Sequence, residues 1–573
     1  MNTLDWILLG AFVTTLALLT RPMGAYLTHV LDPRGRTGLE PFIGGIERWT
    51  YRLLRIDPDV EQGWKAYAGS LLTFSVVSAG LTFLLLRFQH LLPLNPAGLP
   101  GLSADLAFNT AVSFMTNTNW QAYAGESTMS HLSQMVALTF HNFASAAAGI
   151  AVAAALVRGL SRSASHTLGN FWVDLIRITY HLLLPLSVVF AVFLVSRGVI
   201  QNFDGPQTAT ALDPAVTNRI VIPGGPVASQ VAIKMLGTNG GGFFNANAAH
   251  PFENPDPLSN WVQMLSIFLI GSGLTHYLGR ATRNPGHGWS VWGAMMLLFV
   301  AGVWACTTAE SAGNPLHTPL GIAATDGHME GKEVRFGLFG SALFACITSA
   351  ASCGAVNAMH DSFSPLGGLV PLFNIELGEV IVGGVGAGLY GMLLFVLLAV
   401  FIAGLLVGRT PEYLGKRIEA REVKLTMIPL LASCAAILGF AAVAVVSQWG
   451  LAGLNNTGPH GLSEILYAFS SAVGNNGSAF AGLSANTPAY NLTLAAAMLI
   501  GRFAVILPVL ALSGSMGAKN PAPAGAGTFP VSGPTFILLL VGTVLLVGAL
   551  NFLPVLSLGP VVEHFLCPLG RTF

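Results

Sequence analysis

Backbone carbonyl groups are the chemistry most plainly set up by this sequence, in a glycine-rich stretch from Gly237 to Gly242 (Gly-Thr-Asn-Gly-Gly-Gly). Each glycine costs a helix about 1 kcal/mol relative to alanine, so three in a row oppose a continuing helix. Glycine also accepts backbone conformations that are closed to other residues. Carbonyl oxygens turned inward by such a backbone can replace the hydration shell of a cation. The stretch therefore predicts an ion-binding loop.

Three weaker copies of this pattern occur along the chain. They are Met115–Asn119, Ala351–Gly354 and Gly474–Gly477, and with Gly240 in the second loop their last residues recur roughly every 120 residues. A single loop of this kind is usually a turn, because Gly and Asn tolerate left-handed backbone. Four at a regular spacing, each expected after a helix too short to cross a bilayer, favour convergence around one axis. Irregular backbone at membrane depth must be covered by protein or water.

The four loops contain no Asp or Glu. An acidic ring that selects divalent cations is therefore disfavoured, and a weakly hydrated monovalent cation fits best, with potassium as the natural candidate. The short helices before the loops are expected to aim their C-terminal ends, which carry partial negative charge, at the cavity below.

Two charged residues, Glu379 and Arg502, lie within apolar segments. A charge at the bilayer centre costs about 2.5–3.5 kcal/mol on insertion scales, so such residues usually face a cavity or each other. The alternative is that either one lies near an interface and extends its charge to water. We predict that both face the inner half of a pore, close enough to feel each other's charge.

A second glycine run follows Glu379 and contains Gly383, Gly384, Gly386 and Gly388. Four glycines cost a helix about 4 kcal/mol relative to alanine, so the segment is predicted to unwind below the loops. Close packing of two helices through small residues is the alternative. The run also matches GxGxxG, but it neither follows a strand nor opens a βαβ unit, so it is not a dinucleotide site.

Composition defines the elements that must position these residues. The 573 residues are 53% hydrophobic and only 9% charged, with no net charge, which indicates a polytopic membrane protein in a lipid bilayer and gives no sign of a nucleic-acid partner. The five cysteines show no CxxC spacing, so no disulfide framework or metal site is indicated. Asp5 precedes the first apolar run, which favours a retained helix over a cleaved signal peptide.

The predicted fold is an all-α polytopic membrane protein with ten transmembrane helices and four pseudo-symmetric repeats of helix, pore loop and helix around one pore. An arginine-rich loop is expected after the first span, and Ser463 and Glu464 are expected to cap the short helix of the fourth repeat. The predicted units are an extra N-terminal helix (1–30), repeat one (65–157), repeat two (172–280), repeat three (288–408), repeat four (424–517) and an extra C-terminal helix (533–557).

Basic residues predict the orientation. Placing the loop after the first span inside puts most of them inside as well, so both termini and all four filter loops are expected on the outer side. The inner basic residues would be those of 34–65, 158–162, 280–283 and 409–424, together with Lys519.

Nucleotide chemistry has no motif in this chain. The segment from Gly327 to Glu333 only faintly resembles a phosphate loop, with the wrong spacing and Glu where Ser or Thr should hold magnesium. No HExxH pair and no convergent acid–base pair supports the further hypothesis of a membrane-embedded enzyme. The chain is therefore not expected to hydrolyse ATP by itself.

The loop motifs resemble those of one family, KdpA, over essentially the whole chain. They are Thr116–Gln121, Gly237–Asn245, Thr348–Gly354, Gly474–Phe480 and Glu379–Gly388. The resemblance implies a potassium-binding and translocating subunit in the bacterial inner membrane. It also implies a P-type ATPase partner, KdpB, which would use ATP and Mg²⁺, together with KdpC and often KdpF. It implies no covalently bound cofactor in this chain, and potassium as the transported ion.

The resemblance also assigns residue roles. It places Gln121, Glu379 and Arg502 near the pore and its inner gate, with the second glycine run beside them. The filter residues that it implies are Asn117, Thr118, Asn119, Thr238, Asn239, Gly240, Ser352, Cys353, Gly354, Asn475, Asn476 and Gly477. The alternative function is a passive potassium channel or symporter of the same superfamily, which ten spans with extra helices at both ends disfavour.

Overall fold

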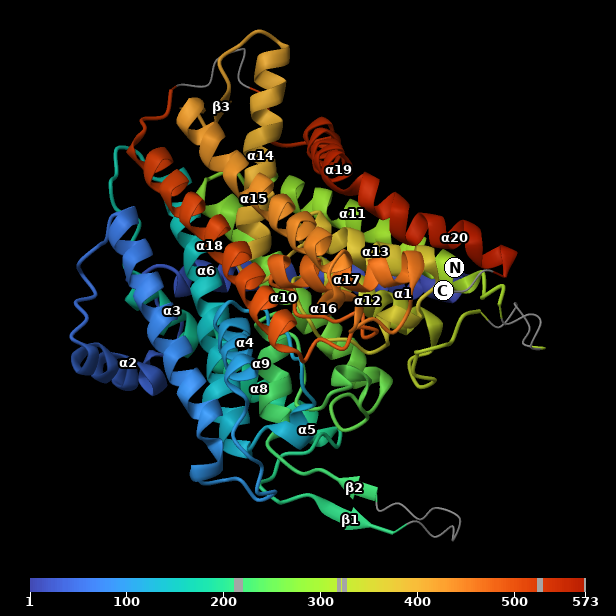
Figure 1. Cartoon of the computed structure of the whole chain (residues 1–573). Coiled ribbons are helices and arrows are strands. Elements are labelled where there is room, and N and C mark those ends of the chain that lie inside the picture. The colour runs from blue at the N-terminus through green and yellow to red at the C-terminus, as the bar shows by residue number, and fades with distance from the viewer. Residues whose placement is uncertain (211–219, 317–320, 322–326, 523–528, 571–573) are drawn as a thin grey trace.

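The computed structural model describes residues 1–210, 220–316, 321, 327–522 and 529–570. Within these residues, ten helical segments are long and apolar enough to cross a membrane, as predicted (Figure 1). They are α1 (Thr3–Val30), α3 (Trp64–Arg87), the segment Ser133–Ser161 that contains α6 (Phe140–Ser161), the segment Phe171–Ser196 that contains α7 (Phe171–Arg177) and α8 (Leu184–Ser196), α10 (Pro257–Ala281), α11 (Pro285–Ser311), α14 (Ala387–Leu406), α15 (Ala420–Val445), α18 (Pro488–Ala518), and the segment Pro534–Leu569 that contains α19 (Pro534–Leu556) and α20 (Val562–Leu566).

Shorter helices precede each of the four loops and lie among the long helices in Figure 1. A helix rises about 1.5 Å per residue, so these cannot cross a hydrocarbon core of about 30 Å. They are α4 (Ala104–Met115), α9 (Val227–Leu236), α12 (Gly337–Ala350) and α17 (Gly458–Gly474), and α13 (Pro365–Glu376) is a fifth short helix before α14. Two further α-helices are only four residues long, α5 (Gly125–Thr128) and α16 (Gln448–Leu451).

A polar cap explains where one of these helices begins, and one predicted cap is wrong. The Ser103 side chain accepts a hydrogen bond from the Leu106 amide, which starts α4. The helix α17 starts after Thr457, so Ser463 and Glu464 lie inside it instead of capping it. The Glu464 carboxylate accepts from the amides of Asn455 and Asn456, both at 3.1 Å, and holds the preceding loop.

The segment after α1 differs from the expected arginine-rich loop, because Glu40–Leu54 forms the helix α2. Its inward face is polar: the Glu47 carboxylate pairs with Arg177 at 3.4 Å and with His181 at 2.9 Å. Its outward face is apolar and includes Phe42 and Trp49. This pattern is the inverse of that of a helix packed on a hydrophobic core, whose apolar stripe faces the protein. A sequence search for buried apolar positions therefore misses α2.

Small residues and one buried ion pair hold the long helices together. A Cβ on Gly24 of α1 would lie 2.6 Å from the Gly273 carbonyl oxygen of α10, so the two helices approach through glycine. Arg158 of α6 binds the Asp174 carboxylate of α7 in bidentate fashion, at 2.6 and 2.8 Å, and Tyr67 of α3 donates to the same carboxylate at 2.8 Å. Removing one member of such a buried pair costs about 3–5 kcal/mol.

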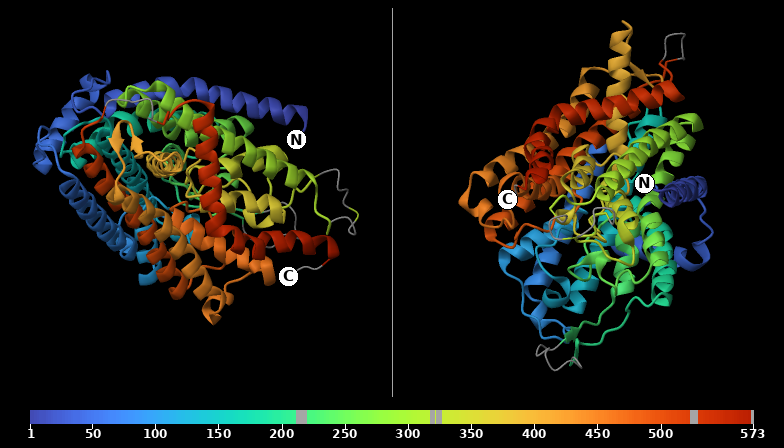
Figure 2. Two further views of the ribbon diagram at one scale, coloured as in Figure 1. Left: turned by 90° about the horizontal axis from the view of Figure 1, so that it is seen from above. Right: turned by 90° about the vertical axis from the view of Figure 1, so that its right-hand side faces the viewer.

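Regular strands are confined to two short antiparallel pairs in the described residues. The strand β1 (Gln207–Ala209) pairs with β2 (Ile220–Ile222), and β3 (Glu412–Tyr413) pairs with β4 (Lys416–Arg417). The helix α1 runs along one edge of the molecule, as the left view of Figure 2 shows. The N-terminus and α20 lie at the same end of the molecule (Figures 1 and 2).

Candidate ion-binding site

The four loops share one backbone conformation. The residue two positions before the end of each loop is left-handed, with φ of 64° at Asn117, 45° at Thr238, 51° at Ser352 and 57° at Asn475. Left-handed backbone is uncommon for residues other than glycine, and least expected for a β-branched residue such as Thr238. The surroundings must therefore hold each loop in this shape.

One backbone hydrogen bond also recurs in all four loops. The amide next to the end of each loop donates to the carbonyl five residues earlier, on the preceding short helix. The pairs are Thr118 to Ser113 (2.9 Å), Asn239 to Lys234 (2.9 Å), Cys353 to Thr348 (3.1 Å) and Asn476 to Ser471 (2.9 Å). Each loop thus closes over the C-terminal end of its helix, where the partial negative charge of the helix dipole lies.

Contacts between loops join them into a closed ring. The side-chain amide of Asn117 in loop one donates to the Thr238 carbonyl of loop two at 3.3 Å. The side-chain amide of Asn475 in loop four donates to the Thr118 hydroxyl of loop one at 2.9 Å. Loop three joins loop four because the Ser352 hydroxyl donates to the Asn475 carbonyl at 3.0 Å. The backbones of Gly240 and Gly354 lie against each other and close the ring between loops two and three.

The backbone of Gly240 requires glycine for two reasons. Its φ is +79°, and a Cβ there would lie 1.9 Å from the backbone nitrogen of Gly354. Similarly, a Cβ on Gly477 would lie 1.8 Å from the Thr118 carbonyl oxygen. The backbones of neighbouring loops therefore approach so closely at these two glycines that no side chain fits between them.

Side chains of α6 support loop one, and sequence analysis missed them. The Asn119 amide donates to the Asn142 side-chain oxygen at 2.6 Å, and the Ser145 hydroxyl donates to the Asn117 side-chain oxygen at 2.7 Å. The side-chain amide of Asn239 in loop two donates to the same Asn117 oxygen at 2.5 Å. The only available signal was the presence of polar residues in an alanine-rich span, and such residues are often buried without any role in binding.

Gln121 connects loops one and two. Its side-chain oxygen accepts from the Gly242 amide at 2.9 Å, and its side-chain nitrogen donates to the Gly242 carbonyl at 3.0 Å and to the Tyr123 hydroxyl at 3.1 Å. It lines a cavity of about 810 Å³, which Gly241, Gly354 and Gly477 also line. Gln121 thus lies in a cavity that borders the loops.

The second glycine run is unwound. The helix α13 ends at Glu376 and α14 begins at Ala387, and Glu379, Gly383 and Gly386 between them have positive φ. The run is also closely packed: a Cβ on Gly386 would lie 2.1 Å from the Gly149 carbonyl oxygen of α6, and a Cβ on Gly388 would lie 2.0 Å from the Val382 carbonyl oxygen. Of the two interpretations of the run, unwinding is therefore correct for the part before Ala387.

This unwound segment, 377–386, is bonded to loops two and four and to the end of α12, which leads into loop three. The Val385 amide donates to the Thr238 hydroxyl at 2.9 Å, and the Gly383 amide donates to the carbonyl of Ala350, just before loop three, at 3.0 Å. The Glu379 carboxylate accepts from the side-chain amide of Asn476 in loop four at 2.6 Å. The segment therefore closes the ring from one side.

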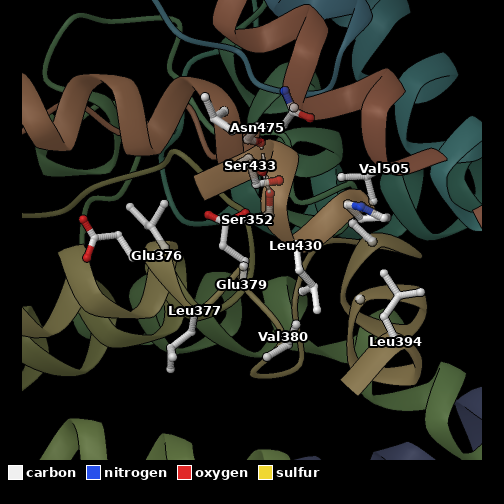
Figure 3. Close-up of a pocket in the computed structure, with 18 of the residues that line it drawn as sticks. Ser352, Glu376, Leu377, Glu379, Val380, Leu394, Leu430, Ser433, Asn475 and Val505 are labelled. Atoms are coloured by element: carbon white, nitrogen blue, oxygen red, sulfur yellow. Dashed lines mark hydrogen bonds between the residues drawn. The ribbon is translucent and has the colours of Figure 1, made fainter. Parts of the chain in front are cut away.

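Glu379 and Arg502 line one cavity of about 110 Å³ together with Asn117, Ser352 and Asn475. Figure 3 shows Glu379 beneath Ser352 and Asn475. In the described part of the chain no ion pair joins Glu379 and Arg502. Arg502 instead donates to the Ser145 carbonyl of α6 at 3.2 Å. The shared cavity was predicted, but direct pairing is not found, because the left-handed turn at Glu379 directs its carboxylate to loop four.

One cluster of acids and histidine lies apart from the ring, at the start of α17. Among the described residues, Asp361, His460 and Glu464 are the group whose ligand atoms lie close enough to hold a metal ion. His460, however, already contacts Asp361 at 2.9 Å and Glu563 at 2.8 Å through its two ring nitrogens. A protonated His460 that bridges two carboxylates explains this cluster without a metal.

This bridge predicts a pH dependence. Burial lowers the pKa of His460, but the hydrogen bonds to Asp361 and Glu563 outweigh it and raise the pKa from 6.5 to about 10. A raised folded-state pKa gives stability that is fully present below pH 6.5 and is lost as the pH rises through about 10. We expect the thermal midpoint in detergent to fall as the pH rises from about 7 to about 10, and expect H460Q to remove most of that slope. An unchanged slope in H460Q would contradict the bridge.

These features define a class of protein. Ten membrane-length helices surround four short helices whose loops meet in a neutral ring, with an unwound segment beneath it, all within the described residues. This arrangement is that of a helical membrane protein built around an ion pore. The chain belongs to the family described as "Potassium-transporting ATPase A subunit" (KdpA), whose model matches residues 10–565.

Relatives match over nearly their full length. A protein of Methylorubrum extorquens is 58% identical over 99% of this chain and 98% of its own, and one of Granulibacter bethesdensis is 57% identical over 98% of each. Both are named potassium-transporting ATPase potassium-binding subunit. The crystal structure of the potassium transporter TrkH from Vibrio parahaemolyticus has a TM-score of 0.52, at 15% identity over 88% of this chain and 98% of TrkH, so it shares the fold.

Proposed function

We propose that this chain binds potassium in the ring of four loops and passes it inward as the ion-translocating subunit of an ATP-driven transporter. The observation that carries the proposal is the closed ring itself. Each of its four loops has a left-handed residue at the same position and the same backbone hydrogen bond from an amide to a helix end. The loops contain no acidic side chain. Rings of main-chain oxygens suit a monovalent cation that gives up its water easily.

The proposed filter consists of the last three residues of each loop, from Asn117, Thr238, Ser352 and Asn475 onward. Gln121 would meet the ion on the outer side. Glu379, Arg502 and the unwound segment 377–386 would form the inner gate. Four helix–loop–helix repeats, within 65–157, 172–280, 288–408 and 424–517, would supply the four loops, with the helices in 1–30 and 533–557 added at the ends.

Energy for transport would come from a partner. The chain has no nucleotide motif, and its relatives are named as subunits of a potassium-transporting ATPase. We assign ATP and Mg²⁺ to a P-type ATPase subunit, KdpB, and expect KdpC and KdpF to complete the complex. We place the chain in the bacterial inner membrane, and the distribution of basic residues supports an orientation with both termini outside.

The rival function is a passive potassium channel or symporter, since the fold is shared with a potassium transporter. Co-purification decides between them. We expect a tagged chain to isolate a P-type ATPase whose activity rises with potassium, and expect the chain alone in vesicles to pass no potassium. Potassium flux through the isolated chain without ATP would favour the rival.

A further inference from the structure

Three of the four loops are held by a hydroxyl group at one fixed position. The residue six positions before the end of the loop is Ser113, Thr348 or Ser471 in loops one, three and four. The Ser113 hydroxyl donates to the Trp120 carbonyl at 2.9 Å, and the Thr348 hydroxyl donates to the Ala355 carbonyl at 2.6 Å. The Ser471 hydroxyl accepts from the Gly477 amide at 3.0 Å. Each side chain thus ties the far end of its own loop back to the short helix.

Loop two has Lys234 at this position. The side chain of Lys234 is 1% exposed and forms an ion pair with Glu253, which is fully buried in the segment after the loop. The other carboxylate oxygen of Glu253 accepts from the Phe244 amide at 2.8 Å. Lys234 therefore reaches the far end of its loop as the three hydroxyl residues do, but through a second side chain.

The ion pair also lies directly against the glycine run. A Cβ on Gly242 would be 2.8 Å from the Glu253 carboxylate oxygen that binds Phe244. The backbone carbonyl of Lys234 meanwhile accepts from the Asn239 amide at 2.9 Å. The two residues thus contact loop two at both ends: Lys234 bonds Asn239, and Glu253 bonds Phe244 after the glycine run.

We infer that Lys234 and Glu253 are positioning residues that set the ion selectivity of loop two, in the role that a single hydroxyl plays in the other three loops. This inference rests on the proposed function. Glycine-rich backbone has little shape of its own, so the position of its carbonyls depends on what is bonded around it. The pairing also keeps the site neutral, because an unpaired ammonium group next to the ring would repel a cation.

The experiment uses the purified complex with its ATPase partner and compares the half-activating concentrations of K⁺, Rb⁺ and Na⁺. E253D keeps the charge but shortens the side chain, which withdraws the carboxylate from Phe244. The double variant K234M/E253Q removes both charges without leaving one unpaired. We expect both to assemble and to lower the preference for K⁺ over Rb⁺ by about fivefold or more, because the coordination of loop two is altered.

The matched control is D174N, which breaks the buried Arg158–Asp174 pair on helices α6 and α7. We expect it to lower the thermal midpoint while the ratio of K⁺ to Rb⁺ stays within about twofold of wild type, since separate sites act independently. A wild-type ratio in an assembled E253D overturns the inference, as does an equal shift in D174N. Failure of E253D to assemble also overturns it, because the pair would then be a requirement of the fold. A wild-type complex that does not prefer K⁺ over Na⁺ would instead refute the proposed function.

Discussion

G240D is expected to weaken potassium binding about tenfold or more, which corresponds to about 1.4 kcal/mol of lost coordination. Two causes act together. The backbone φ of +79° and the nitrogen of Gly354, 1.9 Å from the position of a Cβ, force loop two away from loop three. The added carboxylate also puts a formal charge beside an otherwise neutral ring. Discrimination against sodium, rubidium and ammonium should fall as well. The measurement is the ATPase activity of the purified complex, titrated with each cation.

The control for this substitution is G98D. Gly98 has a similar φ of +62°, but no atom lies within 4 Å of the position of its Cβ. It therefore carries the same backbone strain and the same new charge away from the ring. We expect G98D to keep the wild-type order of ions. A G240D complex with wild-type potassium affinity and ion order would show that Gly240 does not border the bound ion.

The loops and the spans could be predicted from the sequence because both leave strong local signals. Apolar runs of membrane length are visible directly in composition, and Gly237–Gly242 breaks a helix wherever it occurs. The regular spacing then predicts that four distant loops meet. The contacts between Asn117 and Thr238 and between Thr118 and Asn475 show that loops far apart in sequence are indeed neighbours.

Side-chain partners could not be predicted in the same way, because they depend on the direction in which a turn points. Glu379 and Arg502 share a cavity, as their cost in lipid suggested, but the left-handed backbone at Glu379 aims its carboxylate at Asn476. Lys234 and Glu253 lie 19 residues apart, and a lone lysine in a short helix does not reveal its partner. The helix α2 is hidden for a related reason, since its polar stripe faces the protein and its apolar stripe faces outward.

The contacts of Glu379 predict which step of transport it serves. Its carboxylate accepts from the side-chain amide of Asn476 and so holds the unwound segment 377–386 to loop four, whereas the contacts of Gln121 between loops one and two are formed without it. We expect E379Q to lower the maximal potassium-stimulated ATPase rate about tenfold, or about 1.4 kcal/mol in the barrier. The potassium concentration that gives half-activation should change less, because the ring above keeps its carbonyls. Arg502 lines the same cavity but is bonded to Ser145 and not to Glu379, so we expect E379Q and R502M to couple through the cavity by about 0.5–3 kcal/mol, without the loss of about 3–5 kcal/mol that follows when one partner of a buried ion pair is removed.

E376Q is the control for this prediction. Glu376 lines the same cavity, but it lies at the end of α13 and its carboxylate turns away from Glu379 toward Ser470, 3.4 Å away (Figure 3). It contacts neither the ring nor the unwound segment by any side-chain hydrogen bond in the described residues, so its neutralisation should leave the maximal rate within about twofold of wild type. Equal losses in E379Q and E376Q would mean that the cavity needs negative charge in general. A loss confined to E379Q would mean that transport depends on the hydrogen bond between Glu379 and loop four. This contact would then couple ion binding at the ring to movement of the unwound segment 377–386.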